Sequence, residues 1–137
     1  FTAMAHLVLG LSLGIAPVGA YMAVTGGAAT ECWILAAVVM TWCAGFDIIY
    51  ALQDREFDIK EGLHSIPSKF SVRTSLYISI ALHVVTIAAL AWFVFLMPRS
   101  ILIWIGAAIF VAIIVLEHNG LASTTLAVFV ITGLLLA

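Results

Sequence analysis

Four carboxylates lie at and beyond the end of a long apolar segment, and their spacing is what could do chemistry in this chain. On an α-helix at about 100° per residue, they and one tyrosine fall within about 80° of one another. These side chains are Asp47, Tyr50, Asp54, Asp58 and Glu61. The spacing predicts one acidic face on a helix that continues from the apolar segment to about Glu61.

Asp54 and Asp58 are one helical turn apart, about 6 Å along the axis. Two carboxylates at this separation repel each other, but together they offer oxygen ligands to a hard divalent cation. Mg²⁺ is usually held by one or two carboxylates together with substrate phosphates. Arg55, Lys60 and Lys69 lie close by in the sequence and suit contacts with phosphate. The pattern predicts an Mg²⁺ site for a phosphate or diphosphate headgroup, with Asp54 and Asp58 as the ligands.

Asp47 lies about 10 Å deeper along the same predicted helix, inside the apolar region. Carboxylates near hydrocarbon are costly and usually functional. An ordinary solvated helix end would explain Asp54 and Asp58 without any ligand, but it would leave Asp47 unexplained. The position of Asp47 therefore indicates a function beyond that of a solvated helix end, and Tyr50 lies on the same predicted face.

The elements that position these residues must lie in a membrane. The chain has 137 residues, of which 65% are hydrophobic and 9% charged, whereas soluble domains carry about 25% charged residues. A transmembrane helix needs roughly 20 apolar residues. Five segments have this length or come close to it, namely residues 3–25, 32–53, 75–97, 101–116 and 121–137. We predict an all-α fold, a polytopic transmembrane helix bundle.

The positions of the charged residues predict the orientation of that bundle. The chain has seven acidic and five basic residues, and nine of these twelve lie between Asp47 and Arg73. Four of the five basic residues are in the loop between the second and third segments. Because loops rich in Lys and Arg stay in the cytoplasm, we expect this loop on the cytoplasmic side. The lipid bilayer is the expected surrounding, and we expect no nucleic-acid partner.

Glycine and proline indicate how the segments pack and where they end. Gly10 and Gly14 form a GxxxG pattern in the first segment, which predicts close packing against another helix. Gly62 and Pro67 are the first strong helix breakers after the acidic stretch. They predict a loop over residues 62–73, before the third segment begins.

Three histidines lie within or near the apolar segments. His83 is inside the third segment, where a lone histidine is more often hydrogen-bonded within the bundle than a ligand. His6 and His118 lie near the predicted inner surface, and their positions alone indicate no chemistry.

The acidic stretch resembles a known motif. The run DIIYALQDREFD at residues 47–58, followed by EGLHSIP at residues 61–67, is similar to the second aspartate-rich motif of the UbiA-type intramembrane aromatic prenyltransferases. The runs HLVLG at residues 6–10 and APVG at residues 16–19 resemble the preceding helix of that family. The resemblance extends over about residues 1–80 and is greatest to the branch of 4-hydroxybenzoate polyprenyltransferases.

This resemblance implies a bundle of nine helices in the bacterial inner membrane, with a lateral opening to lipid and a polar cap at the cytoplasmic side. In the family, two aspartate-rich motifs face each other and bind Mg²⁺ and a polyprenyl diphosphate. The C–O bond to diphosphate ionises, and the allylic cation attacks an electron-rich carbon of an aromatic acceptor.

Matched by position, the resemblance gives each residue of the stretch a role. Asp54 and Asp58 would bind Mg²⁺ and the diphosphate. Asp47 would orient or deprotonate the phenol of the acceptor, and Tyr50 would line the site. The phosphate contacts would come from Arg55, Lys60 and Lys69.

The family's first aspartate-rich motif, NDxxDxxxD, has no counterpart in this chain. Half of the implied metal site is therefore missing. We expect residues 1–137 to be a single transmembrane prenyltransferase domain truncated at its N-terminus. It would hold five helices of nine and be inactive on its own.

The leading interpretation is an Mg²⁺-dependent enzyme that transfers a polyprenyl group to 4-hydroxybenzoate in ubiquinone biosynthesis. Another aromatic acid, from menaquinone biosynthesis, is the alternative acceptor. Two interpretations of other classes stay open. A transporter or channel would use Asp47 as an intramembrane ion site and would show an inverted repeat of this segment. A non-catalytic membrane subunit would use the acidic stretch neither for catalysis nor for ion transport.

Overall fold

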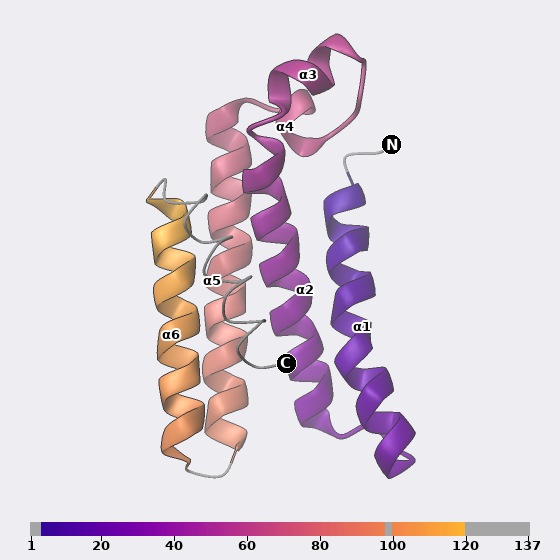
Figure 1. Cartoon of the computed structure of the whole chain (residues 1–137), viewed down its shortest axis with the longest axis vertical. Helices are drawn as coiled ribbons and strands as arrows, with labels where there is room; N and C mark the ends of the chain where they lie inside the picture. The colour runs from indigo at the N-terminus through magenta and orange to yellow at the C-terminus, as the bar shows by residue number, and fades with distance from the viewer. Residues whose placement is uncertain (1–3, 98–99, 120–137) are drawn as a thin grey trace. The chain divides into compact units, whose positions relative to one another are not determined.

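The protein is described by a computed structural model that covers residues 4–97 and 100–119, and every regular element in that part is an α-helix. The chain divides into two compact units, Phe1–Pro98 and Arg99–Ala137. The helices of the first unit are α1 (Ala5–Thr25), α2 (Thr30–Ala51), α3 (Arg55–Lys60), α4 (Ile66–Lys69) and α5 (Val72–Leu96), shown in Figure 1. The second unit holds α6 (Ile101–His118).

Four of these helices, α1, α2, α5 and α6, are long and apolar enough to cross a membrane. They confirm the predicted all-α membrane fold and four of its five predicted segments, while residues 121–137 lie outside the described residues. Large apolar side chains on these helices stay exposed, including Val24, Phe95 and Leu102. Exposed apolar surface of this extent is typical of a protein that contacts lipid. The chain is an integral membrane protein.

α1 and α2 pack closely because α1 presents glycines to its neighbour. Gly10 and Gly14 are buried on α1. A Cβ atom at Gly14 would lie 2.7 Å from the carbonyl oxygen of Ala36, and one at Gly10 would collide with the carbonyl oxygen of Met40. Helices approach this closely only where no side chain separates their backbones. The packing predicted from the GxxxG pattern is confirmed.

α5 faces α2 with a stripe of polar side chains that recur every three or four residues. The buried members of this stripe are Ser75, Ser79, His83 and Thr86. The Ser79 hydroxyl donates to the carbonyl oxygen of Gly45 at 2.8 Å, and His83 Nε2 lies 3.4 Å from the carbonyl oxygen of Trp42. The predicted role of His83 as a hydrogen-bonded residue of the bundle is confirmed.

The acidic stretch does not form the continuous helix that its spacing predicts. α2 ends at Ala51, and α3 begins at Arg55 after a turn over residues 52–54. Glu61 is only the C-cap of α3. The prediction of one helix to about Glu61 is wrong, and so is the single acidic face that depended on it.

Two features at the start of α3 account for this break. Asp54 occupies the N-cap position, where aspartate is favoured over a helix interior, although its side chain makes no capping hydrogen bond here. Arg55 Nε donates to the carbonyl oxygen of Pro67 at 2.8 Å and so ties the start of α3 to α4. Because the second contact joins residues twelve positions apart, the local spacing of the acids could not reveal it.

The predicted loop over residues 62–73 contains the short helix α4. Ser65 and Ser68 form a capping box at its start: each hydroxyl accepts from the other's backbone N–H, at 3.2 and 2.8 Å. Pro67 lies in the first turn, where its missing N–H removes no helical hydrogen bond. The loop prediction is wrong over α4 because it treated this proline as a breaker. α5 also begins earlier than predicted, at Val72.

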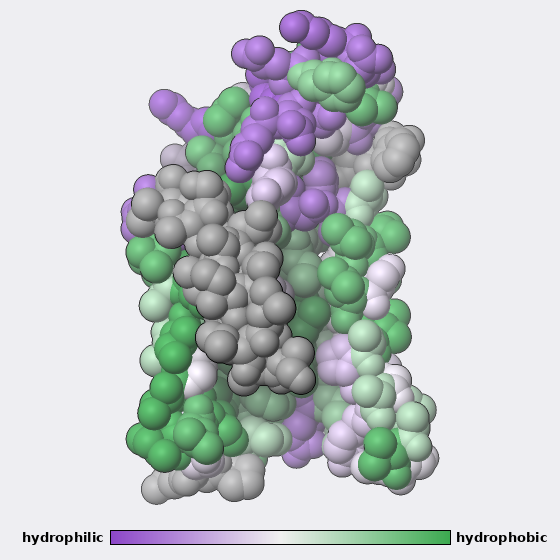
Figure 2. Space-filling view, in the orientation of Figure 1, coloured by the Kyte–Doolittle hydropathy of each residue, from purple (hydrophilic) through white to green (hydrophobic). Residues whose placement is uncertain are grey.

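Polar residues gather at the end of the first unit that carries α3 and α4, which we call the polar cap. Figure 2 shows hydrophilic residues concentrated there and apolar residues along the long helices. The N-terminal end of α1 and the C-terminal end of α2 both reach this cap, as Figure 1 shows. The fold therefore places the polar cap next to the ends of two apolar helices.

Replacing Gly10 with alanine tests the contact between α1 and α2. The new methyl group would meet the backbone of Met40, so we expect Gly10→Ala to reduce stability by about 1–3 kcal/mol. Gly19→Ala is the matched control on the same helix, because a Cβ atom there meets nothing within 4 Å. Thermal unfolding in detergent should show a lower unfolding temperature for Gly10→Ala and an unchanged one for Gly19→Ala. Equal unfolding temperatures would contradict the close packing.

Candidate functional site

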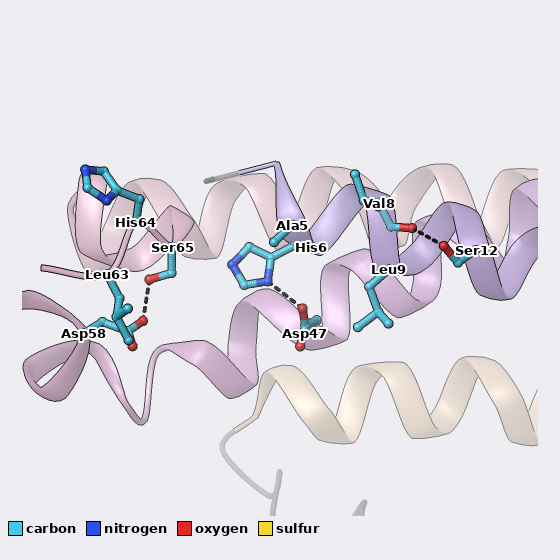
Figure 3. Close-up of a pocket in the computed structure, with 10 residues that line it drawn as sticks. All are labelled: Ala5, His6, Val8, Leu9, Ser12, Asp47, Asp58, Leu63, His64 and Ser65. Atoms are coloured by element: carbon cyan, nitrogen blue, oxygen red, sulfur yellow. Dashed lines mark hydrogen bonds and ion pairs between the residues drawn. The ribbon is translucent and has the colours of Figure 1, made fainter. Parts of the chain in front are cut away.

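A pocket of about 850 Å³ opens beside the polar cap, between the start of α1, the end of α2 and the segment from α3 to α4. Its described lining is partly apolar and partly able to form hydrogen bonds, as Figure 3 shows. The apolar lining residues are Ala5, Val8, Leu9 and Leu63. The polar ones are His6, Ser12, Asp47, Asp58, His64 and Ser65.

Asp47 is one of the two acids in the described lining of the pocket and forms a hydrogen bond with a histidine of α1. His6 Nδ1 lies 2.5 Å from Asp47 Oδ2. The His6 side chain is 8% exposed, whereas that of Asp47 is 34% exposed. Hydrogen bonds to an ionised group are shorter and stronger than those between neutral groups. One oxygen of Asp47 is therefore held by α1, while the carboxylate remains open to the pocket.

Asp58 lies on α3 and is held by the N-cap residue of α4. The Ser65 hydroxyl donates to Asp58 Oδ2 at 2.6 Å. The same hydroxyl caps α4, so this one serine fixes the start of that helix and the orientation of the carboxylate. Two acids from different helices, Asp47 and Asp58, thus line the same pocket.

Asp47 and Asp58 come to line one pocket in a different way from the one predicted. Asp54 and Asp58 keep their spacing of one turn, because the Asp58 N–H bonds to the Asp54 carbonyl oxygen at 2.9 Å. The turn before α3 breaks their alignment with Asp47. The chain instead folds back after α3, and the bond from Ser65 brings Asp58 to the pocket that Asp47 lines.

The other predicted site residues lie outside the described lining of this pocket. Tyr50 is exposed and packs its ring on Phe46, with ring centroids 5.5 Å apart. Asp54 is exposed at the N-cap of α3. Arg55 uses its Nε atom to hold Pro67. The remaining two, Lys60 and Lys69, are exposed. Their predicted roles stay predictions.

The acids of the cap suit a divalent cation only in part. Carboxylate oxygens are the ligands that Mg²⁺ prefers. In residues 4–97 and 100–119, however, no three His, Cys, Asp or Glu side chains come together as a metal site. Asp58 lines the pocket and Asp54 lies one turn before it, so these two carboxylates would be available to an ion that takes its other ligands from substrate phosphates, the usual arrangement for Mg²⁺. These residues are thus compatible with a shared metal–diphosphate site.

Two residues of this site were missed from the sequence, His6 and Ser65. His6 carries a usable signal, because it lies four and eight residues before Gly10 and Gly14 and so shares their helix face. That face packs on α2, so a polar residue on it should find a partner there. The signal for Ser65 is the sequence Ser-Ile-Pro-Ser, which predicts a capped helix start.

Ser65→Ala should loosen α4, because it removes both the N-cap and the bond to Asp58. Loss of a serine N-cap costs about 0.5–2 kcal/mol, so we expect amide exchange at Ser68 and Lys69 to become about tenfold faster. Hydrogen exchange read by mass spectrometry measures this. Ser71→Ala, which removes the N-cap of α5, is the control and should leave α4 unaffected. Unchanged exchange in α4 of Ser65→Ala would contradict the assigned role.

Comparison with known proteins finds several relatives of this chain. The chain is 30% identical over 119 residues to a 4-hydroxybenzoate octaprenyltransferase of Chromohalobacter salexigens, covering 87% of this chain and 40% of that protein. It is 29% identical over 120 residues to a 4-hydroxybenzoate solanesyltransferase of Synechocystis, covering 88% and 41%. A 4-hydroxybenzoate octaprenyltransferase of Francisella tularensis subsp. novicida is 35% identical over 78 residues, covering 57% and 28%.

The chain thus spans about two fifths or less of the length of these relatives. No solved structure matches it significantly. The model of the UbiA prenyltransferase family matches residues 1–135, which is nearly the whole chain. On this match the chain belongs to the UbiA prenyltransferase family.

Proposed function

We propose that the protein transfers a polyprenyl group from a polyprenyl diphosphate to the ring of 4-hydroxybenzoate, in an Mg²⁺-dependent step of quinone biosynthesis. Membership of the UbiA prenyltransferase family supports prenyl transfer over the transporter and non-catalytic alternatives. The names of the relatives support 4-hydroxybenzoate as the acceptor.

The observation that carries this proposal is the pocket that combines Asp47 and Asp58 with an apolar wall. A prenyl diphosphate is charged at one end and hydrocarbon along its length. Its headgroup would lie at the polar cap beside Asp58, and its first isoprene units along Val8 and Leu9 of α1. A pocket at the junction of cap and membrane helices suits both parts of such a molecule.

Each step of the reaction has a candidate group in this chain. The bond between the prenyl C1 atom and the diphosphate oxygen breaks, and its electron pair leaves with the diphosphate. C1 then bonds to a ring carbon of the acceptor, and the hydrogen on that carbon leaves as a proton to the released diphosphate or to water. Asp47, with one oxygen held by His6, accepts a hydrogen bond from the phenol and stabilises the positive charge that develops on the ring.

Asp54 and Asp58 are the proposed ligands on the diphosphate side. Bound Mg²⁺ would neutralise charge on the departing diphosphate. Arg55 and the exposed Lys60 and Lys69 add positive charge to the same cap. In this proposal phosphate oxygens of the substrate would supply further ligands to the ion.

The proposed setting is the bacterial inner membrane, with the polar cap in the cytoplasm. Four basic residues of the first unit lie between α2 and the first turn of α5: Arg55, Lys60, Lys69 and Arg73. Their retention on the cytoplasmic side follows the positive-inside rule. A cytoplasmic cap would also give the site access to water-soluble 4-hydroxybenzoate.

Prenyl transfer should require Mg²⁺ and the two proposed ligands, Asp54 and Asp58. We expect membranes from cells that express the complete reading frame to transfer a prenyl group to radiolabelled 4-hydroxybenzoate, and EDTA to stop the reaction. Asp58→Ala and Asp54→Ala should each abolish turnover, because each removes a ligand for the metal and diphosphate. Glu56→Ala, which removes an exposed carboxylate of α3, is the matched control and should retain activity.

Undiminished turnover in both aspartate variants would reject the metal assignment. Transfer to an aromatic acid of the menaquinone type, with none to 4-hydroxybenzoate, would instead reject the acceptor and leave prenyl transfer intact. Comparing the two acceptors in one assay separates these outcomes.

Asp47→Asn should act on chemistry more than on binding of the donor. The amide keeps the shape of the carboxylate but cannot accept a proton or offset positive charge, so we expect kcat to fall by about a hundredfold or more. The KM for the prenyl diphosphate should change little, since the headgroup is placed beside Asp58. A large rise in this KM with unchanged kcat would instead place Asp47 in donor binding.

A further inference from the structure

His6 joins three elements of the first unit at the polar cap. It belongs to α1, its Nδ1 atom lies 2.5 Å from Asp47 of α2, and its Nε2 atom accepts from the backbone N–H of Ile66, the first residue of α4, at 3.4 Å. More than nine tenths of its side chain is buried. Figure 3 shows the imidazole between Asp47 and Ser65. Both ring nitrogens therefore have partners from other helices.

These two partners determine which ring nitrogen carries the proton. A backbone N–H can only donate, so Nε2 must offer its lone pair to Ile66. The hydrogen of the neutral ring then lies on Nδ1 and points to the Asp47 carboxylate. A histidine that holds this tautomer donates to one oxygen of Asp47 and cannot compete for the other, because its second nitrogen is already engaged.

The geometry points to His6 as a positioning residue for Asp47. We propose that it anchors Asp47 Oδ2 through Nδ1–H, leaves Oδ1 for the hydroxyl of the aromatic acceptor, and through Nε2 fastens the start of α4 beside the pocket. The part that concerns the acceptor rests on the function proposed above. The tautomer and the attachment of α4 do not depend on it.

The consequence for the reaction is a carboxylate with one free oxygen in a fixed direction. A carboxylate that turns freely presents a productive oxygen only part of the time, and small misplacements of reacting groups can lower rates by about a hundredfold. His6 removes that freedom. It also couples α4, and with it the Ser65 that holds Asp58, to the helix that holds Asp47.

Two substitutions separate the two contacts of the ring. The amide nitrogen of asparagine is as many bonds from the backbone as Nδ1, so His6→Asn can still donate to Asp47 but cannot reach Ile66. The amide oxygen of glutamine is as many bonds away as Nε2, so His6→Gln can still accept from Ile66 but no longer holds Asp47 in the same way. His6→Leu removes both contacts.

The expected results differ in kind between these variants. For prenyl transfer by the complete protein, we expect kcat to fall about a hundredfold in His6→Gln and His6→Leu, and less than about tenfold in His6→Asn. KM for the prenyl diphosphate should stay within about twofold in all three. Hydrogen exchange in α4 should accelerate in His6→Asn and His6→Leu and stay close to the parent in His6→Gln. His118→Asn, outside the first unit, is the control for a histidine change.

A spectroscopic measurement tests the tautomer without any activity. In the protein labelled with ¹⁵N-histidine, His6 is one of four histidines and is assigned by its loss in His6→Asn. We expect a protonated Nδ1 and an unprotonated Nε2. A proton on Nε2, or equal losses of kcat in the asparagine and glutamine variants, would overturn the proposal. If the parent shows the expected tautomer but transfers no prenyl group, the proposed function fails while the role of His6 in the fold stands.

Discussion

The close contact of α1 with α2 is the constraint on which the rest of the site depends. Gly10 and Gly14 allow the two backbones to touch, and they do so at one relative position along the helices. With Gly14 against Ala36 and Gly10 against Met40, the next position of the same face, His6, falls at Asp47. A bulkier residue at either glycine would separate the helices and part the histidine from its acid. The geometry of a polar site is thus set by a packing contact between small residues.

The polar cap completes the site by satisfying its own backbone and side-chain groups. A segment at the membrane surface that leaves polar groups unpaired close to hydrocarbon loses several kcal/mol for each. Here the Ser65–Ser68 capping box, the bond from Arg55 to Pro67 and the bond from Ser65 to Asp58 provide those partners. The same bonds turn the chain back over the end of α2. The hydrogen bonds that stabilise the cap are therefore the same ones that form the pocket.

α2 carries this arrangement because it is packed on both sides by different means. On the α1 side the contact is through glycine, and on the α5 side it is through hydrogen bonds such as that between the hydroxyls of Thr41 and Thr86 at 2.8 Å. In lipid the hydrophobic effect contributes little to helix association, so close packing of small residues and interhelical hydrogen bonds stabilise the contacts instead. Gly45 takes part in both kinds of contact. Its carbonyl oxygen accepts from the Ser79 hydroxyl, and a Cβ atom at Gly45 would lie 2.6 Å from His83 Nε2. Asp47, two residues further along, is consequently placed on a helix that is packed on two sides.

The sequence by itself determined the membrane fold, the spans of four helices and the identity of the acids, because hydrophobic length, glycine spacing and charge position are local properties. It also indicated the family, through the motif around Asp47, Asp54 and Asp58. It could not place Asp47 relative to Asp54 and Asp58, since the turn before α3 is held by a bond between Arg55 and Pro67, which are twelve residues apart along the chain. Nor could it reveal that His6 and Ser65 hold the two acids of the pocket. Those pairings arise only when α1, α2 and α4 meet, and hydrogen bonds between separate helices have no fixed spacing in sequence.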